Sequence, residues 1–65
     1  MTEYALWGYS PQSTVEQLLY SRMDTLSAAM RIQKILETEH DCTKVRIQRI
    51  DFNENPTELF TQSIN

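Results

Sequence analysis

Residues 24–40, DTLSAAMRIQKILETEH, repeat their apolar side chains at the spacing of one amphipathic helix. The opposite side of this helix is polar. Two adjacent small residues, Ala28 and Ala29, let another backbone come close, which favours a helix lying flat on a sheet. At about 100° per residue the apolar face gathers Ala28, Ala29, Ile32, Ile35 and Leu36, flanked by Leu26 and Met30.

The two ends of this helix carry different signals. Asp24 is predicted to be the N-cap, because its carboxylate can accept backbone N–H groups of the first turn and meets the positive end of the helix dipole. No glycine follows the last turn, so His40 or Asp41 must make the turn out of the helix. Glu37 and Glu39 oppose the dipole, and we expect the last turn to fray.

A strand is predicted before the helix at residues 3–9, EYALWGY, a stretch rich in aromatic side chains. Gly8 marks a bend or a close approach of a neighbouring backbone. Both faces of this strand are apolar. Alternation places Tyr4 and Leu6 on one face and Ala5, Trp7 and Tyr9 on the other.

A second strand is predicted after the helix at residues 43–52, TKVRIQRIDF. Val45 and Ile47 share one face, but Ile50 and Phe52 fall on the other. Either a bulge lies near Gln48 and Arg49, or the second half of the strand is covered on its other face.

Residues 15–22, VEQLLYSR, fit two structures. Helical spacing of the apolar residues and a capping box formed by Ser13 and Glu16 favour a helix. A strand would explain the break before Asp24 and would enlarge a sheet that two strands alone make poorly. We predict the strand and keep the β-α-α-β order as the alternative.

The last residues are predicted to form a short helical turn that starts at Asn55 and Pro56 and docks through Leu59, Phe60 and Ile64. The predicted fold is therefore a single α+β domain over residues 1–65, a small β-β-α-β unit with one long helix on one face of the sheet. Residues 53–65 are predicted to be an acidic C-terminal extension.

A chain of 65 residues buries only about 60% of its unfolded surface, so a lone monomer would be marginally stable. The one cysteine excludes an internal disulfide, and no Cys/His framework for a structural zinc is present. Oligomerisation is the remaining means of stabilisation, and a homodimer is the form we favour.

The formal net charge of −3 lies in the C-terminal part of the sequence. Residues 1–50 hold all six basic residues and six of the nine acidic ones, while Asp51, Glu54 and Glu58 supply the excess. This balance argues against duplex DNA as a partner. No apolar run is long enough to span a membrane, and no basic segment of a signal peptide begins the sequence, so we expect a cytoplasmic protein without membrane association.

One helix covers one face of a sheet, so the other face is predicted to be an interface that contains Trp7, Tyr9 and Phe52, with Leu59 and Phe60 from the tail. A second copy would cover this face in an oligomer. Alternatively, the tail folds over the same face within one chain. These two possibilities predict different molecular masses in solution.

Single-stranded nucleic acid is the alternative ligand for an open sheet face. Trp7 and Tyr9 could stack on bases while Arg46 and Arg49 contact the backbone. The two arginines share a face only if the bulge exists, and the acidic net charge argues against phosphate binding.

His40 and Cys42 form the one pairing of reactive side-chain types, as His-x-Cys. Two ligands close in sequence fall short of a metal site, and no third group is in place to orient the histidine for nucleophilic catalysis. One glycine cannot build a phosphate-binding loop. We therefore predict no catalytic, metal-binding or cofactor-binding residues, and a non-enzymatic protein-interaction or accessory protein that works as an oligomer.

Overall fold

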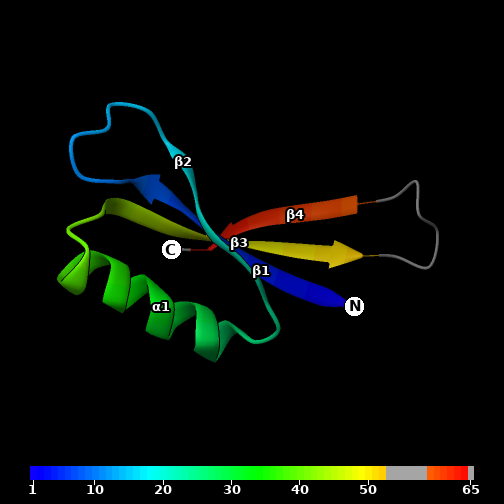
Figure 1. Ribbon diagram of the computed structural model, residues 1–65. Helices are drawn as coiled ribbons and strands as arrows, with labels where there is room; N and C mark the ends of the chain where they lie inside the picture. The colour runs from blue at the N-terminus through cyan, green and yellow to red at the C-terminus, as the bar shows by residue number, and fades with distance from the viewer. Residues whose placement is uncertain (53–58, 65) are drawn as a thin grey trace.

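The computed structural model describes residues 1–52 with their side chains and the backbone of residues 59–64. Four strands form one antiparallel sheet in the order β2-β1-β3-β4, and a single described helix, α1, joins β2 to β3 (Figure 1). The predicted α+β class and the β-β-α-β order are confirmed. The elements are β1 (Thr2–Tyr9), β2 (Gln17–Met23), α1 (Leu26–Glu39), β3 (Thr43–Phe52) and β4 (Leu59–Ile64).

The ambiguous segment forms β2 and pairs antiparallel with β1. Tyr4 lies opposite Met23, and Trp7 lies opposite Leu18, with register shifts between them. Arg22, with a φ of 62°, is one of the irregular positions. Pairing of β2 with β1 supplies backbone hydrogen-bond partners on both sides of the register shifts, which outweighs the helical spacing of its apolar residues.

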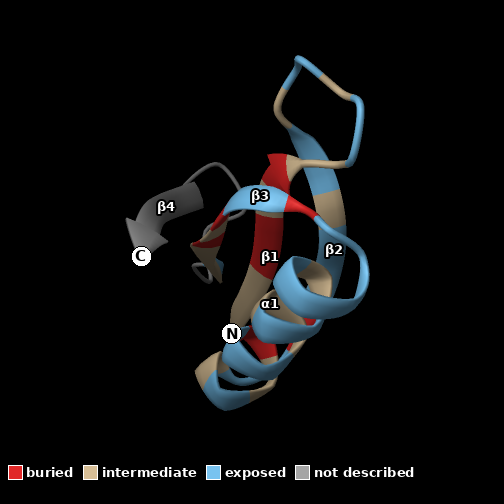
Figure 2. Cartoon of the chain, turned by 90° about the vertical axis from the view of Figure 1, so that its left-hand side faces the viewer, coloured by how far each residue is buried: buried red, intermediate tan, exposed pale blue. Residues whose placement is uncertain are grey.

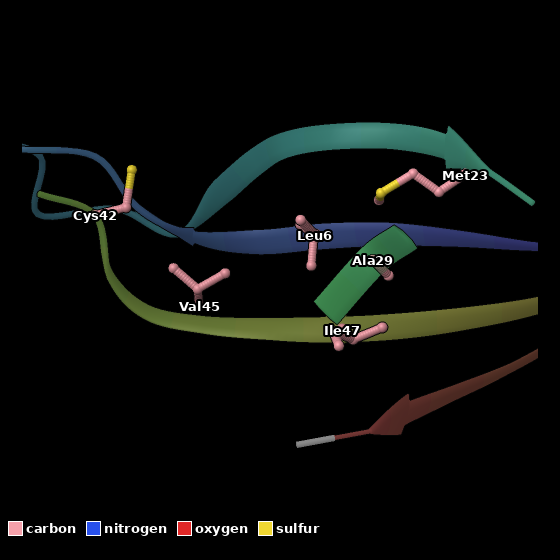
Figure 3. Packing of buried hydrophobic residues seen from close by; sticks show 6 residues of the cluster. All are labelled: Leu6, Met23, Ala29, Cys42, Val45 and Ile47. Carbon is pink, nitrogen blue, oxygen red and sulfur yellow. The ribbon is translucent and has the colours of Figure 1, made fainter. Parts of the chain in front are cut away.

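Helix α1 packs on one face of the sheet, and the buried residues concentrate in β1 and β3 beside it (Figure 2). Ala29 is fully buried, as expected for a helix that lies close to a sheet. The Gln33 side chain donates a 2.8 Å hydrogen bond to the carbonyl of Val45, which ties the helix to β3. Figure 3 shows the six residues of the core: Leu6, Met23, Ala29, Cys42, Val45 and Ile47.

The helix begins one residue later than predicted, because Thr25 and not Asp24 is the N-cap. Thr25 has the extended backbone of a cap residue, with φ −131° and ψ 150°, and its Oγ1 accepts a 3.1 Å hydrogen bond from the N–H of Ala28. The hydroxyl of Thr25 therefore caps the helix, the role predicted for the carboxylate of Asp24.

The predicted turn out of the helix at His40 and Asp41 is confirmed. His40 is the C-cap, and Asp41 takes a left-handed backbone with a φ of 56°, a conformation that short polar residues tolerate. The N–H of Cys42 then donates to the carbonyl of Leu36 at 3.0 Å. This bond satisfies one of the free carbonyls of the last turn.

No bulge lies near Gln48 and Arg49, because β3 pairs with β1 in unbroken register from Arg46 to Asp51. The register shift lies at the other end of β3, beside Lys44, which has a φ of 52°. The apolar residues of β3 change face because α1 lies along its first half only (Figure 1). Past the helix, the side of β3 toward α1 carries partly exposed Arg49 and Asp51 instead of apolar residues.

The predicted C-terminal helical turn is wrong for Leu59, Phe60 and Ile64, the residues through which it was expected to dock. Its start at Asn55 lies outside the described residues, but Leu59–Ile64 forms β4 and pairs antiparallel with β3, from Phe52 opposite Leu59 to Ile47 opposite Ile64. Without β4, β3 would be an edge strand with a row of unpaired N–H and C=O groups. Pairing with β4 satisfies these groups of β3. This part of the predicted extension therefore belongs to the sheet.

Gly8 sits where neighbouring chain comes close, as its position in the sequence predicted. A Cβ at this position would lie 3.0 Å from Leu19 Cδ1, 3.1 Å from the carbonyl oxygen of Thr43 and 3.1 Å from Val45 Cα. Two of these three atoms belong to the backbone, so they cannot move aside as a flexible side chain could.

We expect Gly8→Ala to destabilise the protein by about 1–3 kcal/mol, the usual cost of forcing an extra carbon into a packed site. Urea denaturation followed by circular dichroism measures this change. Thr14→Ala, at an exposed loop position, is the control and should leave the midpoint nearly unchanged. An unchanged midpoint for Gly8→Ala would show that β1 and β3 are farther apart than described.

We expect Thr25→Ala to lower the free energy of unfolding by about 1 kcal/mol, since it removes the side-chain acceptor for the N–H of Ala28. Asp24→Ala is the matched neighbour and should cost only a few tenths of a kcal/mol, about the contribution of an exposed charge near a helix terminus. Thermal or urea unfolding of both variants ranks them. The reverse ranking would return the cap to Asp24.

Candidate interaction surface

The face of the sheet opposite α1 is defined here as the open face. It consists of every second residue from Glu3 to Tyr9 in β1 and from Lys44 to Phe52 in β3, together with Leu18 of β2. No helix or strand among residues 1–52 covers it, because α1 packs on the other side (Figures 1 and 2). Trp7, Tyr9 and Phe52, three of the residues predicted to form the interface, therefore share one face.

Trp7 lies at the centre of the open face and is held by two neighbours on β3. Its indole Nε1–H donates a 2.7 Å hydrogen bond to Gln48 Oε1. The guanidinium of Arg46, which is the cross-strand partner of Trp7, lies 5.7 Å from the ring centroid, within the range of a cation–π contact. The indole is thus half-buried and fixed, with part of its surface exposed.

Arg46 is also bound by a carboxylate from the loop before β2. Its Nη2 and Nε donate to the two oxygens of Glu16 at 2.9 and 3.0 Å, a two-point contact. The hydrogen bond and then the charge of Arg46 lower the pKa of Glu16, and Glu16 in turn raises the pKa of Arg46. The positive charge of Arg46 is therefore balanced within the chain.

The two ends of the open face carry different charged groups, and the N-terminal ammonium of Met1 lies at the same end as Glu3, where it donates to the carbonyl of Phe52 at 3.4 Å. At one end Lys44, exposed at the irregular start of β3, places its Nζ 5.8 Å from the centroid of the Tyr9 ring. At the other end Glu3 pairs with Ile50 and is half-buried. The Arg46–Glu16 pair lies between them and adds no net charge.

Apolar side chains fill much of the remaining open face. Leu18 is 50% exposed and Phe52 is 41% exposed, and Ile50 is half-buried. Leu59 and Phe60, the other two residues predicted for the interface, belong to β4 opposite Phe52 and Asp51. Their side chains lie outside the described residues.

Arg46 and Arg49 lie on opposite faces of β3, since the register between them is regular. Arg49 is opposite Tyr4, and its Nε donates to Asp51 Oδ1 at 3.1 Å. The hydroxyl of Thr2 donates to the same oxygen at 2.9 Å, and this bond, followed by Arg49, lowers the pKa of Asp51. The surface with two arginines that the nucleic-acid alternative required is not formed.

His40 and Cys42 do not form a reactive pair. His40 is exposed at the end of α1, whereas Cys42 is buried in the core with its Sγ 3.9 Å from the carbonyl oxygen of His40. Among residues 1–52 no group of three or more His, Cys, Asp or Glu side chains could hold a metal ion. The part of the chain that the structure describes also has no detectable pocket.

Three residues of this surface had no place in the sequence prediction. The sequence pattern indicates Gln48 only as the place of a possible bulge, Lys44 only as a position in a strand, and Glu16 only as part of a capping box. Each acquires its role from the register between β1 and β3 or from the loop that lies beside them. The register between β1 and β3 places Gln48 and Trp7 on the same face. The sequence of either strand alone does not specify this register.

Comparisons with known proteins assign no function to the open face. No protein-family model, curated protein or solved structure matches this chain. In the described part of the chain, α1 has neither the length nor the apolar character needed to cross a membrane.

We expect the Glu16–Arg46 pair to make stability depend on pH in one direction. The folded pKa of Glu16 is below its ordinary value of 4.5, so the pair stabilises the protein above that pH, and this contribution is lost as the pH falls through the folded pKa. Glu16→Gln should therefore unfold at lower urea than the wild type at pH 7. The difference should shrink below pH 4.5.

Urea titrations of the two proteins from pH 7 to pH 3 measure this change. A difference that stays constant over the range would mean that Glu16 acts through packing and not through its charge.

Proposed function

We propose that this protein is not an enzyme and acts by binding protein through its open face, as a homo-oligomer and most simply as a homodimer. One observation supports this proposal. The sheet has a helix on one face, while the other face presents Trp7, Tyr9, Leu18 and Phe52 at least partly to solvent. Exposed aromatic and apolar side chains gathered on one face of a sheet are typical of interaction sites.

The small size of the core favours the same conclusion. Among residues 1–52, six form the buried cluster between α1 and the sheet, and partly buried side chains pack against it. Domains are built from packed layers, and a sheet with two apolar faces is stable when both are covered. A second sheet packed on the open face, at the usual separation of about 10 Å, would bury the apolar surface that the single chain leaves exposed.

The way Trp7 is held also favours binding. Its hydrogen bond to Gln48 and its contact with Arg46 already restrict the indole in the free chain. A side chain that is ordered before association loses less conformational entropy when a partner binds. Tryptophan, tyrosine and arginine are also the residues that most often supply the binding energy of interfaces.

Binding of single-stranded nucleic acid remains the alternative to protein binding. The contacts of Arg46 with Trp7 and of Lys44 with Tyr9 resemble the pairing of cations and rings that such proteins use. Glu16 balances the charge of Arg46, and Arg49 lies on the other face, so the open face offers little attraction for phosphate. These observations make protein the favoured partner.

We expect the wild-type protein to run at twice the mass of one chain in light scattering behind a sizing column, and Leu18→Lys to shift it to a single chain. A lysine at a half-exposed position on β2 leaves the core intact but buries a charge in the proposed interface. Trp7→Ala should have the same effect, because it removes the central anchor. Circular dichroism checks that both variants stay folded.

Met30→Lys is the matched control, since Met30 is exposed at 56% on α1, away from the open face. It should leave the mass unchanged. A folded Leu18→Lys variant that remains dimeric would place the interface elsewhere. A monomeric wild type that binds a labelled single-stranded oligonucleotide at low salt would replace this proposal with the nucleic-acid alternative.

A further inference from the structure

We infer that β4 is a second interaction surface, and that two copies of the chain pair through it, β4 against β4 in antiparallel orientation, so that their sheets join edge to edge. This inference goes beyond the proposed function, which concerns the open face. It is drawn from a difference between the two outer strands of the described sheet, β2 and β4.

The edge at β2 is unsuited to a further strand. Its register with β1 shifts twice, between the partners of Tyr4 and Leu6 and between those of Leu6 and Trp7. Arg22, in the second half of β2, has a φ of 62°, which takes the backbone out of the extended conformation. Bulges and charged residues are the features that keep another strand from pairing with an edge, and β2 has both.

The edge at β4 has neither feature. Its six residues, LFTQSI, include no charged residue, proline or glycine. Its register with β3 is unbroken from Phe52 opposite Leu59 to Ile47 opposite Ile64. Among residues 1–52 and 59–64, no segment pairs with its outer side. A regular, uncharged strand at the edge of a sheet is the kind that accepts a further strand through its main-chain groups.

Backbone hydrogen bonds fix which groups of β4 point outward. Met1 and Phe52 form a hydrogen-bonded pair, in which the N–H of Phe52 donates to the carbonyl of Met1 at 2.8 Å and the ammonium of Met1 donates back at 3.4 Å. Hydrogen-bonded pairs alternate along an antiparallel ladder, so in the regular part of β3 the even-numbered residues bond to β1 and the odd-numbered ones to β4. The β4 partners of these odd-numbered residues are even-numbered. The outward groups of β4 are therefore those of Leu59, Thr61 and Ser63.

A second copy of β4 fits these outward groups. With a two-fold axis at Thr61, Leu59 of each copy lies opposite Ser63 of the other, and the three outward residues form about six hydrogen bonds. The chain has a net charge of −3, but β4 brings no charge to this contact. The joined sheet has the order β2-β1-β3-β4-β4-β3-β1-β2, so only the interrupted β2 edges remain at its ends. Pairing of two copies thus leaves no regular edge free, whereas addition of a foreign strand would create a new one.

The edge contact and the open face can be used together, because one lies in the plane of the sheet and the other perpendicular to it. Backbone hydrogen bonds formed at an edge replace hydrogen bonds to water, so they stabilise association less than the burial of an apolar face does. We therefore expect two chains in dilute solution and four chains, formed by edge pairing of two dimers, in concentrated solution.

Sedimentation velocity over a series of protein concentrations tests this contact. The wild type should pass from two chains to four as the concentration rises. Thr61→Pro should stop at two chains, because proline removes an outward N–H that β3 does not use. Gln62→Lys should also stop at two chains, because it places a charge of the same sign on both edges. Gln62 pairs with Arg49, on the side of the sheet away from the open face, so this lysine does not touch the open face. Circular dichroism checks the fold of both variants.

Gln17→Lys is the matched control, since it makes the same substitution at an exposed position of β2, the other edge. It should form four chains as the wild type does. If Gln17→Lys prevents the four-chain form and Gln62→Lys does not, the edge used is β2 and the inference is overturned.

The same experiment separates this inference from the proposed function. If the wild type stays at two chains and Gln62→Lys does too, the edge contact is wrong and the open-face dimer stands. If Gln62→Lys reduces the protein to single chains while Leu18→Lys remains dimeric, the edge contact is right and the open face is not the interface between copies.

Discussion

The packing of α1 against the middle of the sheet is the constraint on which the rest of this molecule depends. Ala29 allows the helix to lie directly on β1 and β3, and Leu6, Val45 and Ile47 bury their side chains beneath it. A single helix covers one face of a sheet and only part of its length. The core is therefore small, and the burial of apolar surface that stabilises it is limited by the same geometry.

The distribution of polar residues follows from where the helix ends. Along β3 the side toward α1 is apolar at Val45 and Ile47 and becomes polar at Arg49 and Asp51, where the helix no longer covers it. A hydrogen-bond chain from Thr2 and Arg49 to Asp51 then satisfies these groups at the partly exposed end of the sheet. The change in apolar periodicity thus reflects partial cover by α1, not a bulge.

The open face combines fixed aromatic side chains with balanced charge. Gln48, Arg46 and Glu16 form one connected set of contacts around Trp7, so the ring is ordered without being fully buried. Under the proposed function, such a surface suits a partner with its own apolar layer better than a phosphate backbone, because the charge of Arg46 is already paired with that of Glu16.

The sequence by itself determined the helix, the strands before and after it, the need for close packing at Gly8 and Ala29, and the presence of apolar side chains on both faces of the sheet. These are local properties, since periodicity and residue size act within one element. The tertiary structure decided that Thr25 caps the helix, that 59–64 is a strand, that Arg46 and Arg49 lie apart, and that Glu16 and Gln48 join the site. The cap depends on which residue takes the extended backbone before the first turn. The others depend on the hydrogen-bonding groups of a neighbouring segment or on the register between β1 and β3, which the pattern of a single segment does not encode.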